Sequence, residues 1–122
     1  MAEQERRRVA PRFHLIARVD IATADSAEPI WGAVANISRT GVALYIRQPV
    51  NPGSKVMLRF RFQAEGGREI TEDLNATIVW QRGETGGLEF EAPLVANSPT
   101  ALKAPNLAAH IAKNEAAALE PF

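Results

Sequence analysis

The chain has 122 residues, the size of one domain, and its hydrophobic content of 46% supports a single core and excludes a disordered chain. Fourteen basic and fourteen acidic residues cancel, so the net charge gives no reason to expect general polyanion binding, and any anion site must be local. The absence of cysteine excludes disulfides, cysteine-based metal sites and cysteine nucleophiles.

The first segment, residues 1–12, is polar and basic. Arg7, Arg8 and Arg12 lie in it, and Pro11 removes a backbone donor and biases the preceding residue away from helix. We therefore expect a mobile, extended N-terminal arm. The segment lacks the apolar region of a signal peptide, and no apolar run in the chain approaches the length of a membrane span. The sequence therefore predicts a cytoplasmic protein without membrane insertion.

Six short segments have the period-two alternation or the turn-bounded apolar content of β-strands. They span residues 13–21, 30–37, 42–46, 54–63, 69–81 and 88–90. In the fifth, Leu74, Ala76, Ile78 and Trp80 share one face, and we expect Trp80 to pack in the core or at its rim. Turns rich in Gly and polar residues, such as 64–67 and 82–86, separate the strands. This pattern predicts an all-β protein, an antiparallel barrel or sandwich, and closure into a barrel would remove the exposed edges.

The tail has a different composition. A Pro-bearing connector at residues 97–106 precedes an Ala-rich segment, for which we expect a helix over residues 107–119 with Asn106 as its N-cap. We expect this helix to pack on the barrel or on a partner. The predicted organisation is an arm, a barrel, and a linker with a C-terminal helix, over residues 1–12, 13–92 and 93–122.

Two polar motifs indicate a function. Arg8 and Arg12 are four residues apart, and Asn36, Ser38 and Gly41 follow in a turn between the second and third strands. A guanidinium binds phosphate bidentately and can also bind guanine O6 and N7. An Asn carbonyl can accept from guanine N–H groups, a hydroxyl can bind phosphate or base, and Gly allows positive φ or close backbone approach. Each motif alone is also typical of a solvated terminus or an ordinary turn, but their order on a β background favours a site for an anionic ligand.

With both motifs in this order, the chain resembles the PilZ domain, the bacterial receptor module for cyclic di-GMP. The signature of that family is Arg-x-x-x-Arg followed by Asp/Asn-x-Ser-x-x-Gly. Thr77–Trp80 followed by Gly87–Phe90 is also similar to the closing strands of the family. The resemblance spans roughly residues 6–92, and it implies a six-stranded antiparallel β-barrel.

The resemblance implies a ligand set for cyclic di-GMP, without a metal. The set is Arg7, Arg8, Arg12, Asn36, Ser38, Arg39 and Gly41. Arg8 and Arg12 would hold phosphates and guanine faces, Asn36 and Ser38 would bind guanine edges, and Gly41 would shape the turn. Asn36 stands where many members have Asp, which weakens the expected contact with guanine. An Arg directly before the motif, as Arg7 is here, accompanies binding of an intercalated dimer of the ligand in some members. The arm would close over the ligand and change the surface offered to an unidentified partner protein.

Other functions stay open. A nucleic-acid-binding barrel could use the arm on phosphates, but zero net charge and few aromatic residues argue against it. An interaction module of the same fold that does not bind the nucleotide is the other alternative. We expect no enzyme, because no catalytic constellation can be argued, and no metal site around His14 or His110. A solvated strand face is the favoured interpretation of Lys55, Arg59 and Arg61, with partner docking as the alternative.

Overall fold

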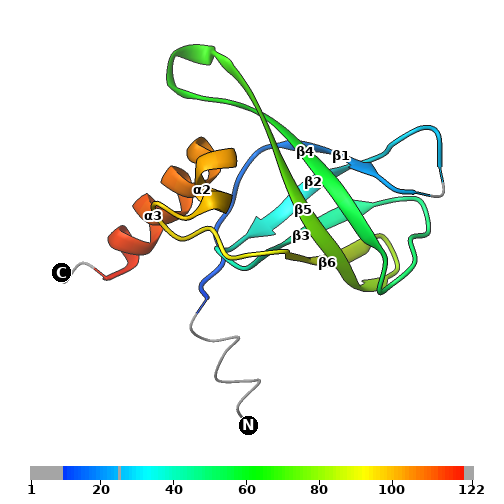
Figure 1. The fold of residues 1–122 in the computed structure, drawn as a ribbon. Helices are drawn as coiled ribbons and strands as arrows, with labels where there is room; N and C mark the ends of the chain where they lie inside the picture. Colours follow the sequence, from blue (N-terminus) through cyan, green and yellow to red (C-terminus); the bar gives the residue numbers. More distant parts are fainter. Residues whose placement is uncertain (1–9, 25, 120–122) are drawn as a thin grey trace, which may run out of the picture.

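The computed structural model describes residues 10–24 and 26–119 and shows a closed, six-stranded antiparallel barrel with helices after the last strand (Figure 1). The strands are β1 (Arg18–Ala22), β2 (Ile30–Ile37), β3 (Gly41–Ile46), β4 (Lys55–Gln63), β5 (Glu69–Arg82) and β6 (Thr85–Phe90). They close in the order β1-β2-β3-β6-β5-β4, with β1 paired to both β2 and β4. The predicted fold is therefore confirmed. Only residues 10–12 of the predicted arm are described.

The barrel interior is filled by alternate residues of each strand, as the period of a β-strand requires. In β4, Val56, Leu58 and Phe60 are buried, whereas the intervening side chains are more accessible. Phe60 meets Phe90 of β6 edge-to-face, with ring centroids 6.4 Å apart. The same cluster of buried apolar residues extends into the last helix through Leu107 and Ile111.

The first predicted strand is shorter than expected. The ladder begins at Arg18, and before it the chain makes an isolated antiparallel bridge between Phe13 and Ile37. The extra residue of β2 between Val34 and Asn36, which shifts the β2–β3 register, lies opposite this gap. A bulge leaves a residue unpaired and interrupts the ladder locally, so residues 13–17 keep alternating burial without regular pairing.

The fifth strand has a bulge of its own, and this bulge makes the predicted common face of Trp80, Leu74 and Ile78 wrong. The β5–β6 register shifts between Ile78 and Trp80, so Trp80 pairs with Gly87 and points outward, 42% exposed. The predicted turn over residues 82–86 is also shorter than expected. β5 ends at Arg82 and β6 begins at Thr85, and Gly83 takes the positive φ of 59° that the tight turn requires.

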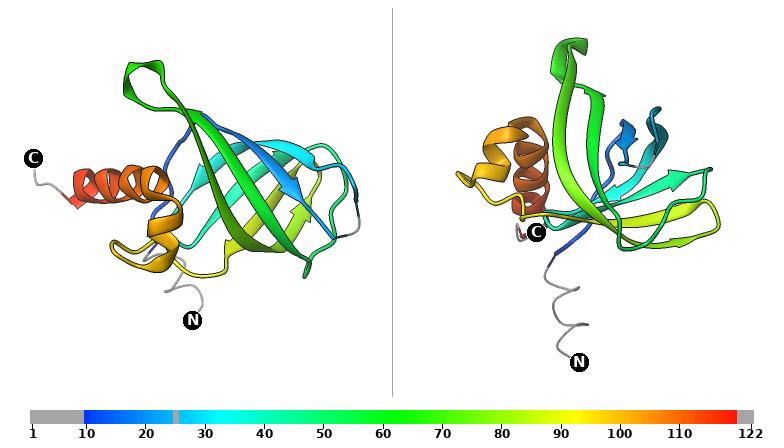
Figure 2. Two further views of the ribbon diagram at one scale, coloured as in Figure 1. Left: turned by 45° about the horizontal axis from the view of Figure 1, so that its top comes forward. Right: turned by 45° about the vertical axis from the view of Figure 1, so that its right-hand side comes forward.

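Two helices follow the barrel. α2 (Pro99–Lys103) lies within the predicted connector, because Ser98 accepts a hydrogen bond from the Ala101 N–H and Pro99 occupies the first turn. α3 (Pro105–Leu119) begins before Asn106, so the predicted N-cap is wrong. Both helices lie on the side of the barrel to which the β4–β5 hairpin projects (Figure 2). Within the described part of the chain, no helix is long and apolar enough to cross a membrane.

The cap of α3 comes from the barrel. Glu72 of β5 faces inward and is only 6% exposed. Its Oε2 accepts from the backbone N–H and the side-chain Nδ2 of Asn106, and its Oε1 accepts from the Leu107 N–H, each at 2.8 Å. A carboxylate is favoured at a helix N-terminus, where backbone N–H groups lack helical partners. Glu72 therefore anchors α3 to the barrel, while Leu107 and Ile111 pack into the core.

Candidate functional site

The bridge between Phe13 and Ile37 brings the two predicted motifs together. The Phe13 N–H donates to the Ile37 carbonyl at 2.7 Å, and the Ile37 N–H donates back at 2.8 Å. The flanking side chains meet as a result, because Arg12 Nη1 donates to Asn36 Oδ1 at 2.8 Å. Arg12 is exposed and Asn36 is half-buried, so this contact lies at the barrel surface. Arg7 and Arg8 lie outside the described residues.

Ser38 organises the turn that follows Asn36. Its side chain is 1% exposed, and its Oγ accepts from the N–H groups of Thr40 and Gly41, both at 3.2 Å. The Ser38 N–H donates to the Gly41 carbonyl at 2.8 Å, which closes the turn. The hydroxyl is therefore already bonded within the turn, as is typical of Ser next to free backbone groups.

Gly41 allows β3 to approach β6 closely. A Cβ at this position would collide with the carbonyl oxygen of Leu88. The turn is also held from outside, since the Phe90 N–H donates to the Thr40 carbonyl at 2.9 Å and the Leu94 N–H donates to the Arg39 carbonyl at 2.7 Å. The Asn-x-Ser-x-x-Gly segment is thus a rigid platform built on β3 and β6.

Helix α3 reaches both motifs. Arg39 Nε lies 3.9 Å from Glu115 Oε2, which connects the turn to the helix. His110 Nε2 lies 2.9 Å from the His14 carbonyl oxygen, which connects the segment after Arg12 to the same helix. The C-terminal helix therefore borders the candidate site, a feature that the sequence pattern did not indicate.

One row of outward-facing positions runs from Asn36 across the barrel. Asn36 pairs with Ala43 of β3, Ala43 with Gly87 of β6, and Gly87 with Trp80 of β5. A Cβ at Gly87 would collide with the Trp80 indole, so the ring lies over this glycine. The small residues Ala43 and Gly87 thus separate the Asn36 amide from the half-exposed Trp80 indole. The Gly86-Gly87 pair was the one sequence signal for this arrangement.

Both positive and negative side chains occur around the turn. Arg39 is in ion-pair range of Glu115, and Glu89 is the Cα partner of Gly41. No group of three or more His, Asp or Glu residues in the described ranges is placed to hold a metal ion.

A family profile decides the relationship of this chain to known proteins. The profile of the PilZ domain matches residues 6–104, which is most of the chain and includes both motifs. The chain belongs to the PilZ domain family. No curated protein matches it.

Solved structures support the PilZ fold. The PilZ domain of CeSA from a cellulose-synthesizing bacterium aligns with a TM-score of 0.58 and 19% identity, over 84% of this chain and 98% of that domain. The Bacillus subtilis inhibitor of motility, MotI/DgrA, aligns with a TM-score of 0.64 and 19% identity, over 90% of this chain. The present chain spans 51% of that second protein. PilZ domains are binding domains that generally serve as cyclic di-GMP receptors, and these neighbours establish the shared fold.

Proposed function

We propose that this PilZ domain is a receptor for cyclic di-GMP. The observation that carries the proposal is the hydrogen bond between Arg12 Nη1 and Asn36 Oδ1, which joins the two signature motifs at one place on the barrel surface. The ligand set is Arg7, Arg8, Arg12, Asn36, Ser38, Arg39 and Gly41. Ser38 and Gly41 act by shaping the turn, because one is buried in it and the other allows close strand contact.

The contact between Arg12 and Asn36 leaves room for a ligand. A carbonyl oxygen has two lone pairs, so Asn36 can accept a guanine N–H in addition to, or in place of, Arg12. Trp80 lies in the same outward row, and an indole in this position can stack on a base. We propose that guanine stacks on the half-exposed Trp80 indole and turns its edge toward the Asn36 amide.

The phosphates require the arginines that precede this site. Arg39 is in ion-pair range of Glu115, so we propose that Arg7, Arg8 and Arg12 supply most of the attraction for phosphate. We propose that the basic segment of residues 6–12 closes over the bound nucleotide and that Arg7 favours an intercalated dimer. Closure would alter the surface presented to a partner protein, and the protein would act by binding rather than by catalysis.

The test is calorimetric titration of the Arg12→Ala variant with cyclic di-GMP. A guanidinium can donate two parallel hydrogen bonds to a phosphate or to guanine. Each hydrogen bond to a charged group contributes about 1.5–3 kcal/mol, so losing both bonds of Arg12 predicts an affinity at least about a hundredfold weaker than wild type. Arg8→Ala should weaken binding in the same way. Arg68→Ala removes an exposed arginine near the tip of the β4–β5 hairpin and should bind like wild type. Wild-type affinity in the Arg12 variant would refute the proposed clamp.

A further inference from the structure

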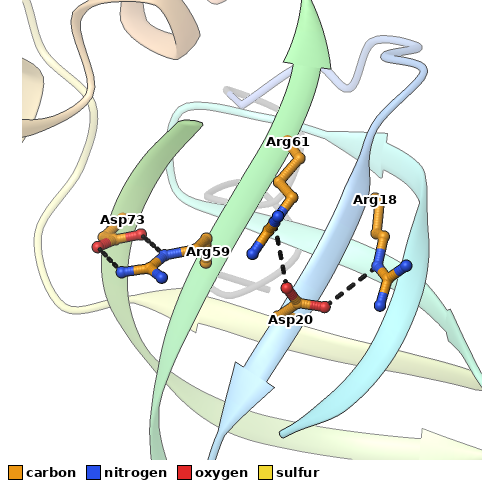
Figure 3. A network of polar contacts seen from close by, with 5 residues as sticks. All are labelled: Arg18, Asp20, Arg59, Arg61 and Asp73. Carbon is orange, nitrogen blue, oxygen red and sulfur yellow. Dashed lines mark hydrogen bonds and ion pairs between the residues drawn. The ribbon is translucent and has the colours of Figure 1, made fainter. Parts of the chain in front are cut away.

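A second polar surface lies on the outer face of the barrel, over β1 and β4. Arg18 and Asp20 of β1 and Arg61 of β4 form it, and Figure 3 shows the two guanidinium groups on either side of the single carboxylate. Arg18 Nε lies 3.2 Å from Asp20 Oδ1, and Arg61 Nε lies 3.2 Å from Asp20 Oδ2. Both carboxylate oxygens are thus engaged, and each arginine uses its Nε atom.

This cluster carries an excess positive charge. Among the residues that the structure describes, Asp20 is the one carboxylate in ion-pair contact with either Arg18 or Arg61. The neighbouring Arg59 differs, because Asp73 neutralises it through two hydrogen bonds of 2.9 and 3.1 Å. Arg18 and Arg61 are also direct Cα partners across β1 and β4, and like charges directly opposite each other destabilise a sheet. The single charge of Asp20 offsets one of the two positive charges, and a bound anion would offset the other.

Aromatic side chains continue the same face. Arg18 pairs with Ala33 of β2, and Ala33 pairs with Tyr45 of β3, whereas Trp31 is two residues from Ala33 on the same strand. Trp31 and Tyr45 are each 58% exposed. The Arg18 guanidinium lies 5.4 Å from the centroid of the Trp31 ring, a cation–π distance that holds the charged group in place.

We infer that this face, formed by Arg18, Arg61, Trp31 and Tyr45, is a docking surface for an acidic segment of a partner protein. Arg, Trp and Tyr are the residues that contribute most often to binding hot spots. The contacts of Arg18 and Arg61 with Asp20, and of Arg18 with Trp31, already restrain the two guanidinium groups, which lowers the cost of ordering them when a partner binds. The uncompensated guanidinium charge selects a carboxylate, and the indole and phenol rings offer apolar contact beside it.

The docking surface goes beyond the proposed nucleotide site. On β3, Tyr45 is two residues from Ala43 of the Asn36 row, so the two surfaces adjoin without sharing these residues. The arrangement would place a docked partner beside any bound nucleotide. Its test uses the ligand-free protein, and therefore a failure of cyclic di-GMP binding would leave this inference standing.

The experiment is an NMR titration of the full, isotope-labelled chain with a synthetic twelve-residue peptide of Glu, Leu and Gly. We expect saturable shift changes centred on β1, β2 and β3 around Arg18, Trp31 and Tyr45. The Arg18→Ala/Arg61→Ala variant should bind about tenfold more weakly, as expected for loss of a charge pair. A peptide with Gln in place of Glu should show the same loss on the wild-type protein.

The controls separate a specific surface from general charge. An Arg68→Ala/Lys113→Ala variant removes two exposed charges elsewhere and should bind within about twofold of wild type. A Trp31→Ala/Tyr45→Ala variant, which leaves every charge in place, should also lose binding. This second variant tests the surface independently if the arginine variant fails to fold. The inference is overturned if shift changes spread equally over Arg68 and Lys113, or if the Gln peptide binds equally well. Binding of a short oligothymidylate, but not the peptide, to this face would overturn it in favour of nucleic acid.

Discussion

The anchor between the barrel and α3 gives the sharpest stability prediction. Glu72→Ala removes a buried acceptor of three hydrogen bonds, from the Asn106 N–H, the Asn106 Nδ2 and the Leu107 N–H. Leu107 is fully buried, so its N–H is poorly placed to find water instead. A hydrogen bond to a charged group contributes about 1.5–3 kcal/mol, but groups near the helix end are partly resolvated. The free energy of unfolding should therefore fall by about 2–4 kcal/mol.

The assay is urea unfolding followed by circular dichroism. Glu72→Gln keeps one carbonyl acceptor and should lose about half as much stability as Glu72→Ala. Glu69→Ala removes an exposed carboxylate from the same strand and should change the free energy of unfolding by less than about 0.5 kcal/mol. If Glu72→Ala unfolded at the same urea concentration as Glu69→Ala, the anchoring role would be refuted.

Two further predictions concern the turn and the ion pairs. Gly41→Ala places a methyl group against the Leu88 carbonyl, so the free energy of unfolding should fall by about 1–3 kcal/mol in the same urea assay. An unchanged free energy of unfolding would contradict the close approach of β3 and β6. The hydrogen bond from Arg59 lowers the pKa of Asp73 below its usual 3.8. The stabilising effect of Asp73 is therefore present above pH 3.8 and lost as the pH falls through its lowered pKa. The free energies of unfolding of wild type and Asp73→Asn should therefore converge in acid. A difference that stays constant with pH would refute the pairing.

The sequence predicted the barrel well where strands are regular. Val56, Leu58 and Phe60 alternate strictly, and the structure buries them as expected. The prediction for Trp80 failed because a bulge shifts the β5 register, and a bulge changes which face a residue takes without changing the local pattern. The resemblance to PilZ domains also predicted that the two motifs lie together. Among the described residues, the contact between Arg12 and Asn36 joins them.

The helices that follow the barrel, and their contact with it, were harder to predict. Ser98 followed by Pro99 is an N-cap and first-turn signal, but the prediction for residues 97–106 was a connector without a helix. Glu72 occupies an inward position between Ile70 and Leu74, and a charged residue in a core position indicates a buried polar partner. The partner, Asn106, is 34 residues away, and that contact depends on tertiary packing.

The central claim is tested most directly by a calorimetric titration of the wild-type protein with cyclic di-GMP, with GTP and a short oligonucleotide as controls. The account predicts saturable heat with cyclic di-GMP alone, and a molar ratio of two nucleotides per chain if the ligand binds as an intercalated dimer. Absence of heat with cyclic di-GMP would contradict the receptor function and leave a PilZ interaction module. Heat with the oligonucleotide instead would indicate a nucleic-acid-binding barrel.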